Sequence, residues 1–231
     1  MRWIEVADRV YARRYEELDQ TLGLVIGDER CLVIDTGTDE HHGAEWAAAI
    51  RGLTALPWTV VITHAHWDHF FGTAAFGDAP VLAHPRCTTE MREHGGVQAE
   101  KWAAKYRVDG RDEVAERLLS ARLVLPTEEI ADSVEVDLGG RVVSLVHPGR
   151  GHTDNDLIAH VPDAGVVFAG DTVEQGAPPS VGEDSYPLEW PAALDTLLGL
   201  DPRTVVPGHG EPVDAEFVLA QRAEIAGRSD R

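Results

Sequence analysis

Four short apolar stretches of the chain each end beside histidine or aspartate, and this feature limits most strongly what the sequence can fold into. The stretch at residues 59–63 leads directly into a histidine-rich segment at residues 64–69. The other three precede Gly151-His152-Thr153, Gly170-Asp171-Thr172 and Gly208-His209-Gly210. Glycine beside each of these residues lets the backbone bend or approach closely. One such strand end could be an ordinary turn, but four in one chain indicate a shared site.

The segment His64-Ala65-His66-Trp67-Asp68-His69 is typical of a metal site. In an extended backbone His64 and His66 point the same way, whereas in a helix they would diverge by about 200°. Asp68 and His69 follow after a turn and could face a second metal. Imidazole and carboxylate ligands together suit zinc, with iron or manganese as alternatives. The competing interpretation is a polar strand end at which Asp68 caps a short helix over residues 70–76.

The remaining pattern alternates strands and helices. We expect strands at residues 4–7, 10–13, 22–26, 31–34, 59–63, 130–136, 141–146, 157–160, 166–169 and 204–206. Thr38 or Asp39 can cap a helix, and two late helices, at residues 191–198 and 212–226, each have proline in the first turn. Residues 86–120 are helical in spacing and mostly polar, which predicts a helical insertion. Residues 1–231 therefore form one domain of two packed sheets with helices outside.

Composition excludes several classes of protein. The chain has 20 Lys and Arg against 40 Asp and Glu, a formal charge of −20, which disfavours nucleic-acid binding. Two cysteines make neither a disulfide framework nor a four-cysteine zinc site. Glu5 and Asp8 interrupt any signal peptide, and no stretch approaches the ~18 apolar residues of a membrane span. We expect a cytoplasmic protein with a small-molecule substrate and no membrane partner; the oligomeric state stays open.

With these motifs in this order, the sequence resembles the metallo-β-lactamase-fold hydrolase superfamily, especially its glyoxalase II-like and lactonase-like metal sites. Residues 32–37, Leu-Val-Ile-Asp-Thr-Gly, match a further segment that is common in the family. The resemblance covers about residues 20–210. It implies an α/β fold, a four-layer αββα sandwich of two mixed β-sheets flanked by helices, with the site along one edge of the packed sheets.

The resemblance also implies roles for single residues. One metal would bind His64, His66 and His152. The other would bind Asp68, His69 and His209, and Asp171 would bridge the two. Asp35 matches a position that accepts a proton from a ligand imidazole, although an ordinary Asp-Thr-Gly turn is its alternative. Tyr186 is our candidate donor to a developing oxyanion, with simple packing between Pro178 and Trp190 as the alternative.

These assignments predict a dinuclear zinc-dependent hydrolase. Two metals about 3.5–4 Å apart share a bridging hydroxide and polarise a carbonyl or phosphoryl oxygen. The expected substrate is an ester, thioester, lactone or amide. Asp68 and Asp171 are the candidate catalytic carboxylates, and Asp68 or a metal-bound water returns a proton to the leaving group.

Three alternatives remain open. A mononuclear iron persulfide dioxygenase uses the same fold with two histidines and one aspartate. Weak β-lactamase-type activity is a second, although the acidic Glu174 would repel the carboxylate of a β-lactam. A binding protein that kept the scaffold without activity is the third.

Overall fold

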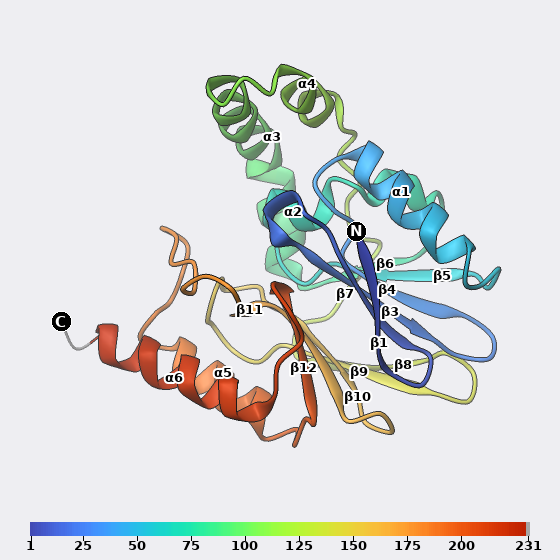
Figure 1. Ribbon diagram of the computed structural model, residues 1–231, viewed down its shortest axis with the longest axis vertical. Coiled ribbons are helices and arrows are strands. Elements are labelled where there is room, and N and C mark those ends of the chain that lie inside the picture. The colour runs from blue at the N-terminus through green and yellow to red at the C-terminus, as the bar shows by residue number, and fades with distance from the viewer. Residues whose placement is uncertain (230–231) are drawn as a thin grey trace.

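The computed structural model, which describes residues 1–229, consists of two mixed β-sheets packed face to face with helices on both outer sides (Figure 1). In spatial order, the seven-stranded sheet contains β1 (Arg2–Ala7), β2 (Val10–Arg14), β3 (Thr21–Ile26), β4 (Cys31–Ile34), β5 (Trp58–Val61), β6 (Val81–Ala83) and β7 (Glu128–Glu129). The five-stranded sheet contains β12 (Thr204–His209), β11 (Val166–Glu174), β10 (Ile158–Val161), β9 (Val142–Val146) and β8 (Ser133–Asp137).

The helices make the two outer layers. The first sheet is flanked by α1 (Glu40–Arg51), α2 (Trp67–Phe70), α3 (Pro85–Val108) and α4 (Asp112–Ser120). The second sheet is covered by α5 (Trp190–Leu198) and α6 (Ala215–Ser229) (Figure 1). Two short 3₁₀ helices, η1 (Glu17–Asp19) and η2 (Thr73–Phe76), lie in connections. The αββα sandwich predicted from the sequence is thus confirmed.

Strand β5 lies in the interior of the first sheet and is buried on both faces. It pairs in parallel with β4 on one side and with β6 on the other. Val60 packs with the helices of the first outer layer, whereas Val61 packs between the two sheets with Phe168 and Val206. A strand buried on both faces needs a continuous apolar run. His64 follows this run in the sequence, just beyond the end of β5.

The structure corrects four details of the predicted elements. Strand β11 continues to Glu174, so Asp171 lies within a strand instead of after it, because parallel pairing with β12 continues past Phe168. The strand predicted at residues 130–136 begins only at Ser133, as β8, and the short strands β6 and β7 of the other sheet were missed. Helix α6 begins at Ala215, not in the turn of Pro212, because the Asp214 carboxylate accepts a hydrogen bond from Phe217 N at 3.0 Å.

Residues 86–120 form most of α3 and all of α4, and an ion pair joins them to the turn before β3. The two guanidinium nitrogens of Arg111 lie 2.9 and 2.6 Å from the oxygens of Glu17, and Tyr106 Oη donates to the same carboxylate at 2.8 Å. The hydrogen bond from Arg111, supported by Tyr106, lowers the pKa of Glu17 against the opposing effect of burial. None of the described helices is both long and apolar enough to cross a membrane.

Glu17→Gln should therefore destabilise the protein by up to about 1 kcal/mol at pH 7. Because folding lowers this pKa from 4.5, the stabilisation is present above that value and is lost as the pH falls through the lower folded-state value. Urea unfolding of both proteins between pH 7 and pH 3 measures the difference. The exposed Glu100→Gln is the control, and a difference that persists undiminished at low pH would contradict the assignment.

Candidate metal centre

Two groups of histidine and aspartate side chains meet at one edge of the sandwich. The first group contains His64, His66, His152 and Asp171, and the second contains Asp68, His69 and His209. Within each group the donor atoms all lie within 4.8 Å of one another. The structure thus brings together all seven residues that the sequence singled out, from four separate stretches of chain.

Strand ends and one short helix put these side chains in place. His64 follows β5, and the single turn of α2 carries Asp68 and His69 directly after it. On the other sheet, Asp171 belongs to β11 and His209 is the last residue of β12. These two strands are parallel, so their carboxyl ends meet at one edge, as ligand sites in such sheets require.

In the first group three ring nitrogens converge. His66 Nδ1 lies 3.0 Å from His64 Nε2 and 2.9 Å from His152 Nε2. Asp171 Oδ2 lies 3.8 Å from His64 Nε2 and 3.6 Å from His152 Nε2. These nitrogens and the carboxylate oxygen surround one small volume.

Asp171 also faces the second group. Its Oδ1 lies 3.3 Å from His69 Nε2 and its Oδ2 lies 3.2 Å from His209 Nε2. Asp68 Oδ2 is 3.5 and 3.3 Å from the same two nitrogens. Asp171 is therefore the one carboxylate with contacts to both groups among the described residues, which is the position expected of a bridging ligand.

The outer nitrogens of these rings bind to acceptors, and this fixes which atoms face inward. Backbone carbonyls accept from Nδ1 of His152 at 3.2 Å and of His209 at 2.9 Å, the acceptors being Ser180 O and Leu18 O. The Asp184 carboxylate accepts from His66 Nε2 at 2.8 Å. In a neutral ring the other nitrogen then carries a lone pair. Such outer partners orient metal-binding histidines and raise their basicity.

Asp35 gives the same support to His69. This buried carboxylate accepts hydrogen bonds from His69 Nδ1, Thr63 N and Thr63 Oγ1, each at 2.7 Å. The Thr63 hydroxyl in turn lies 3.1 Å from His64 Nδ1. Asp35 has the positive φ of 59°, an unusual conformation for a residue other than glycine. Its contacts are those that the sequence suggested for it.

The residues present fit a pair of divalent cations. Lone pairs that face one another repel, and the buried atoms His69 Nε2 and Asp171 Oδ1 have no hydrogen-bond partner in the described part of the chain. Burial, with the neighbouring His66, lowers the pKa of His152 to about 4, so this ring is neutral at pH 7. Neutral imidazoles and carboxylates are the forms that bind metal. The donor set therefore matches a dinuclear site of His and Asp ligands.

Besides Asp35, the sequence predicted one further site residue that is not a metal ligand, Tyr186. Unlike Asp35, Tyr186 makes no hydrogen bond to a ligand histidine in the described part of the chain. Its ring lies under the guanidinium group of Arg150, 5.0 Å from the centroid, and its backbone nitrogen donates to Gly151 O. Trp190, the neighbour proposed in the packing alternative, is buried 5.5 Å from the His152 ring. The contacts of Tyr186 link it to the loop of His152, and its hydrogen bonding to a substrate stays a prediction.

Sequence reasoning missed the support that the loop at residues 175–189 gives to the site. Besides Asp184, this loop contains Ser180, whose carbonyl accepts from His152. Glu174, 5% exposed, holds Ser180 by accepting from its backbone nitrogen at 2.8 Å and from its hydroxyl at 3.1 Å. No spacing rule reveals such contacts, because they depend on how an irregular loop folds back.

Asp184→Asn is expected to weaken metal binding about tenfold, the low end of the range for lost outer partners, because Asp184 is half exposed. Competition with a fluorescent chelator measures the affinity. Glu183→Gln, one residue away and exposed, should leave it unchanged. Equal affinities for wild type and Asp184→Asn would mean that the hydrogen bond to His66 does not support the site.

Comparisons with known proteins agree with this geometry. Residues 16–209 match the sequence profile of the metallo-beta-lactamase superfamily. The chain belongs to this superfamily. It is a metal-dependent hydrolase of that group, with two His/Asp metal-binding groups.

Individual relatives are distant. The chain is 24% identical over 204 residues to the metallo-beta-lactamase type 2 of Bacillus cereus, covering 85% of this chain and 70% of that one. It is 27% identical over 200 residues to the probable metallo-hydrolase YqgX of Bacillus subtilis, covering 82% and 84%. The solved structure of the metallo-beta-lactamase FIM-1 from Pseudomonas aeruginosa, in its mono-zinc form, superposes with a TM-score of 0.72 at 19% identity, covering 99% and 95%.

Proposed function

We propose that this superfamily member is a dinuclear zinc enzyme that cleaves an ester, thioester, lactone or amide of a small molecule. The observation that carries the proposal is the position of Asp171, which lies within 3.8 Å of ring nitrogens in both groups. Zinc suits a set of imidazole and carboxylate donors. The mono-zinc form of the FIM-1 structure supports the same choice of metal.

The reaction depends on what the bound ions supply and on what the chain does around them. Zinc ions held by the two donor groups would supply Lewis acidity and would lower the pKa of a coordinated water towards ~7. Asp171 fixes the spacing of the two groups, and the five outer partners hold the rings rigid. Asp68 belongs to the second group, and its backbone carbonyl accepts a hydrogen bond from Gln20 Nε2 at 2.5 Å. We assign Asp68 the role of holding a proton for the leaving group.

The surroundings of Glu174 argue against β-lactams as the preferred substrates. A basic side chain near this position would grip the carboxylate of the drug, but here an acid occupies it and binds Ser180 of the chain itself. Although the Bacillus cereus relative is a β-lactamase by name, its identity of 24% leaves the substrate pocket free to differ. We therefore propose substrates without an obligatory carboxylate.

Turnover of a matched panel tests the proposal. The panel contains p-nitrophenyl acetate, an S-acyl thioester, γ-butyrolactone and a chromogenic cephalosporin, assayed with the zinc-loaded protein and with His66→Ala. We expect hydrolysis of at least one of the first three, little of the last, and loss of turnover both in the variant and after chelation. Hydrolysis that is indifferent to His66→Ala, or consumption of oxygen on a glutathione persulfide with one bound iron, would overturn the zinc hydrolase.

A further inference from the structure

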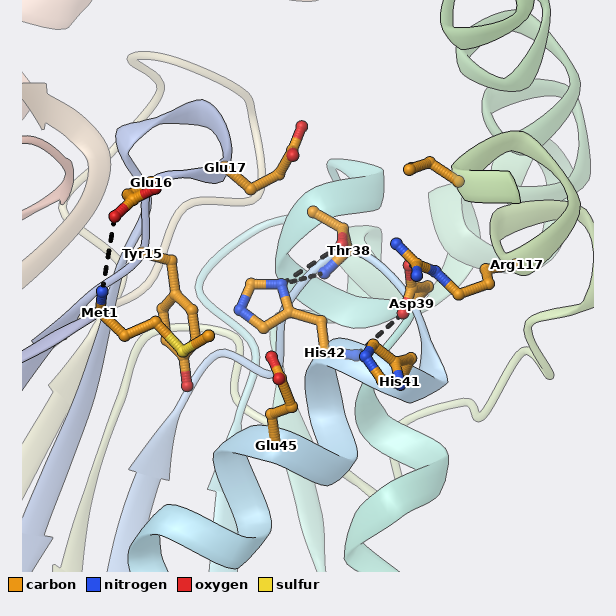
Figure 2. A pocket seen from close by; sticks show the side chains of 11 residues that line it. Met1, Tyr15, Glu16, Glu17, Thr38, Asp39, His41, His42, Glu45 and Arg117 are labelled. Carbon is orange, nitrogen blue, oxygen red and sulfur yellow. Dashed lines mark hydrogen bonds and ion pairs between the residues drawn. The ribbon is translucent and has the colours of Figure 1, made fainter. Parts of the chain in front are cut away.

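A cavity lies apart from the seven donor residues, on the side of the turn that precedes β3. Its volume is about 200 Å³, and Figure 2 shows the side chains around it. Its walls come from the start of α1, from that turn and from α4, and the lining includes Tyr15, Glu17, His42, Glu45 and Arg117. This space far exceeds the ~10–15 Å³ that one water needs. It is smaller than the ~300–1,000 Å³ of pockets for drug-sized ligands, so its ligand must be small.

His42 lines this cavity from the first turn of α1. Its side chain is 6% exposed, between Tyr15 on one side and Thr38 on the other (Figure 2). Thr38 N donates to His42 Nδ1 at 3.2 Å. A backbone N–H can only donate, so Nδ1 accepts and Nε2 of the neutral ring carries the hydrogen. This buried Nε2–H has no hydrogen-bond partner among the described residues, and buried donors rarely lack one.

The charges around the cavity are mostly negative. Glu16, Glu17, Asp39 and Glu45 line it, against Arg117 and the N-terminal ammonium of Met1, which lies 3.9 Å from Glu16. Glu17 is bound by Arg111 and Asp39 lies 3.4 Å from Arg117. Glu45 differs from these because, in the part of the chain that is described, its side chain forms no ion pair and no hydrogen bond. Its carboxylate points toward the His42 ring in Figure 2.

We propose that this cavity binds a small ammonium compound that carries a neutral oxygen, such as an amino alcohol. Its cationic nitrogen pairs with Glu45, and its oxygen accepts the hydrogen of His42 Nε2. The acidic lining repels a ligand whose acceptor is a carboxylate. The ring of Tyr15, 4.2 Å from that of His42, covers the apolar part of the ligand. None of the seven donor residues lines this cavity. Two segments touch both places: the turn at residues 15–20, through Leu18 O on His209, and residues 35–39, through Asp35 on His69.

Calorimetric titration of the zinc-loaded protein with ethanolamine tests this site. We expect saturable binding of one ethanolamine per chain, weakened about tenfold by Glu45→Gln because a charge-assisted hydrogen bond is lost. Glu93→Gln, on an exposed face of α3, should bind like wild type. Ethylene glycol, which lacks the charge, and glycolate, which carries the wrong one, should not bind.

Two further measurements separate this cavity from the metal centre. Binding should persist in Asp171→Asn, since ethanolamine that bound to zinc would be lost with the metal. In wild-type protein labelled with ¹⁵N-histidine, the Nε2–H resonance of His42 should shift on titration. No saturable binding, equal affinity in Glu45→Gln, or loss of binding in Asp171→Asn would each overturn the proposal.

Discussion

Asp171→Asn is expected to abolish hydrolysis, with a fall of at least about 10³-fold. The carboxylate contacts both donor groups, so under the proposed function its loss would remove a ligand from each ion and the negative charge between them. Metal assistance contributes several kcal/mol to transition-state stabilisation, and each 1.36 kcal/mol is about tenfold in rate. Initial rates on the best ester of the panel measure the effect, together with bound zinc by elemental analysis.

Asp132→Asn is the matched control for this substitution. Asp132 is exposed and belongs to neither donor group, so its replacement should change neither rate nor zinc content. If Asp171→Asn kept two tightly bound zinc ions and more than a tenth of the wild-type rate, the bridging role of Asp171 would be wrong.

Gly208→Ala should also disable the enzyme, although residue 208 has no side chain to contribute. A Cβ at this position would overlap Asp171 Oδ1 and would lie 2.9 Å from the backbone carbon of Gly170. Because β11 and β12 pair here, the backbone cannot move away cheaply, so the carboxylate must. A misplacement of ~1 Å in a catalytic centre can cost 10²-fold, and overpacking costs about 1–3 kcal/mol of stability.

Gly96→Ala controls for the loss of glycine itself. Gly96 lies in α3, and a Cβ there would meet nothing within 4 Å. This variant should gain up to about 1 kcal/mol of stability, because alanine favours a helix over glycine. Kinetics and thermal unfolding of both variants test the pair. Full activity of Gly208→Ala would show that Asp171 tolerates displacement.

Sequence reasoning reached the ligand-type residues because their positions follow from strand periodicity. The apolar run before His64 predicts a buried strand, and the residues that directly follow a buried strand lie at the edge of the sheet. The same logic found His152 and His209. It placed Asp171 after a strand instead of inside one, because Gly170 and the polar Thr172 look like a turn while their pairing with β12 is a tertiary property.

The outer partners show where such reasoning stops. The role of Asp35 could be predicted because this residue follows an apolar run in a segment that is common in the family. Asp184 and Ser180 were not, since they lie in an irregular loop whose path no local pattern determines. His42 stands at the start of a helix, where the sequence pattern gives no sign of burial, but contacts with Tyr15 and Thr38 bury it. Contacts between distant irregular segments are set by packing of the whole chain.

The central claim is that two divalent cations occupy the two donor groups at once. An anomalous difference map from crystals of the protein as purified, recorded above the zinc absorption edge, tests this most directly. The account predicts two peaks per chain on either side of the Asp171 carboxylate, one among the nitrogens of His64, His66 and His152 and the other near His69 and His209. A single peak, or none in protein that still hydrolyses its substrate, would contradict it.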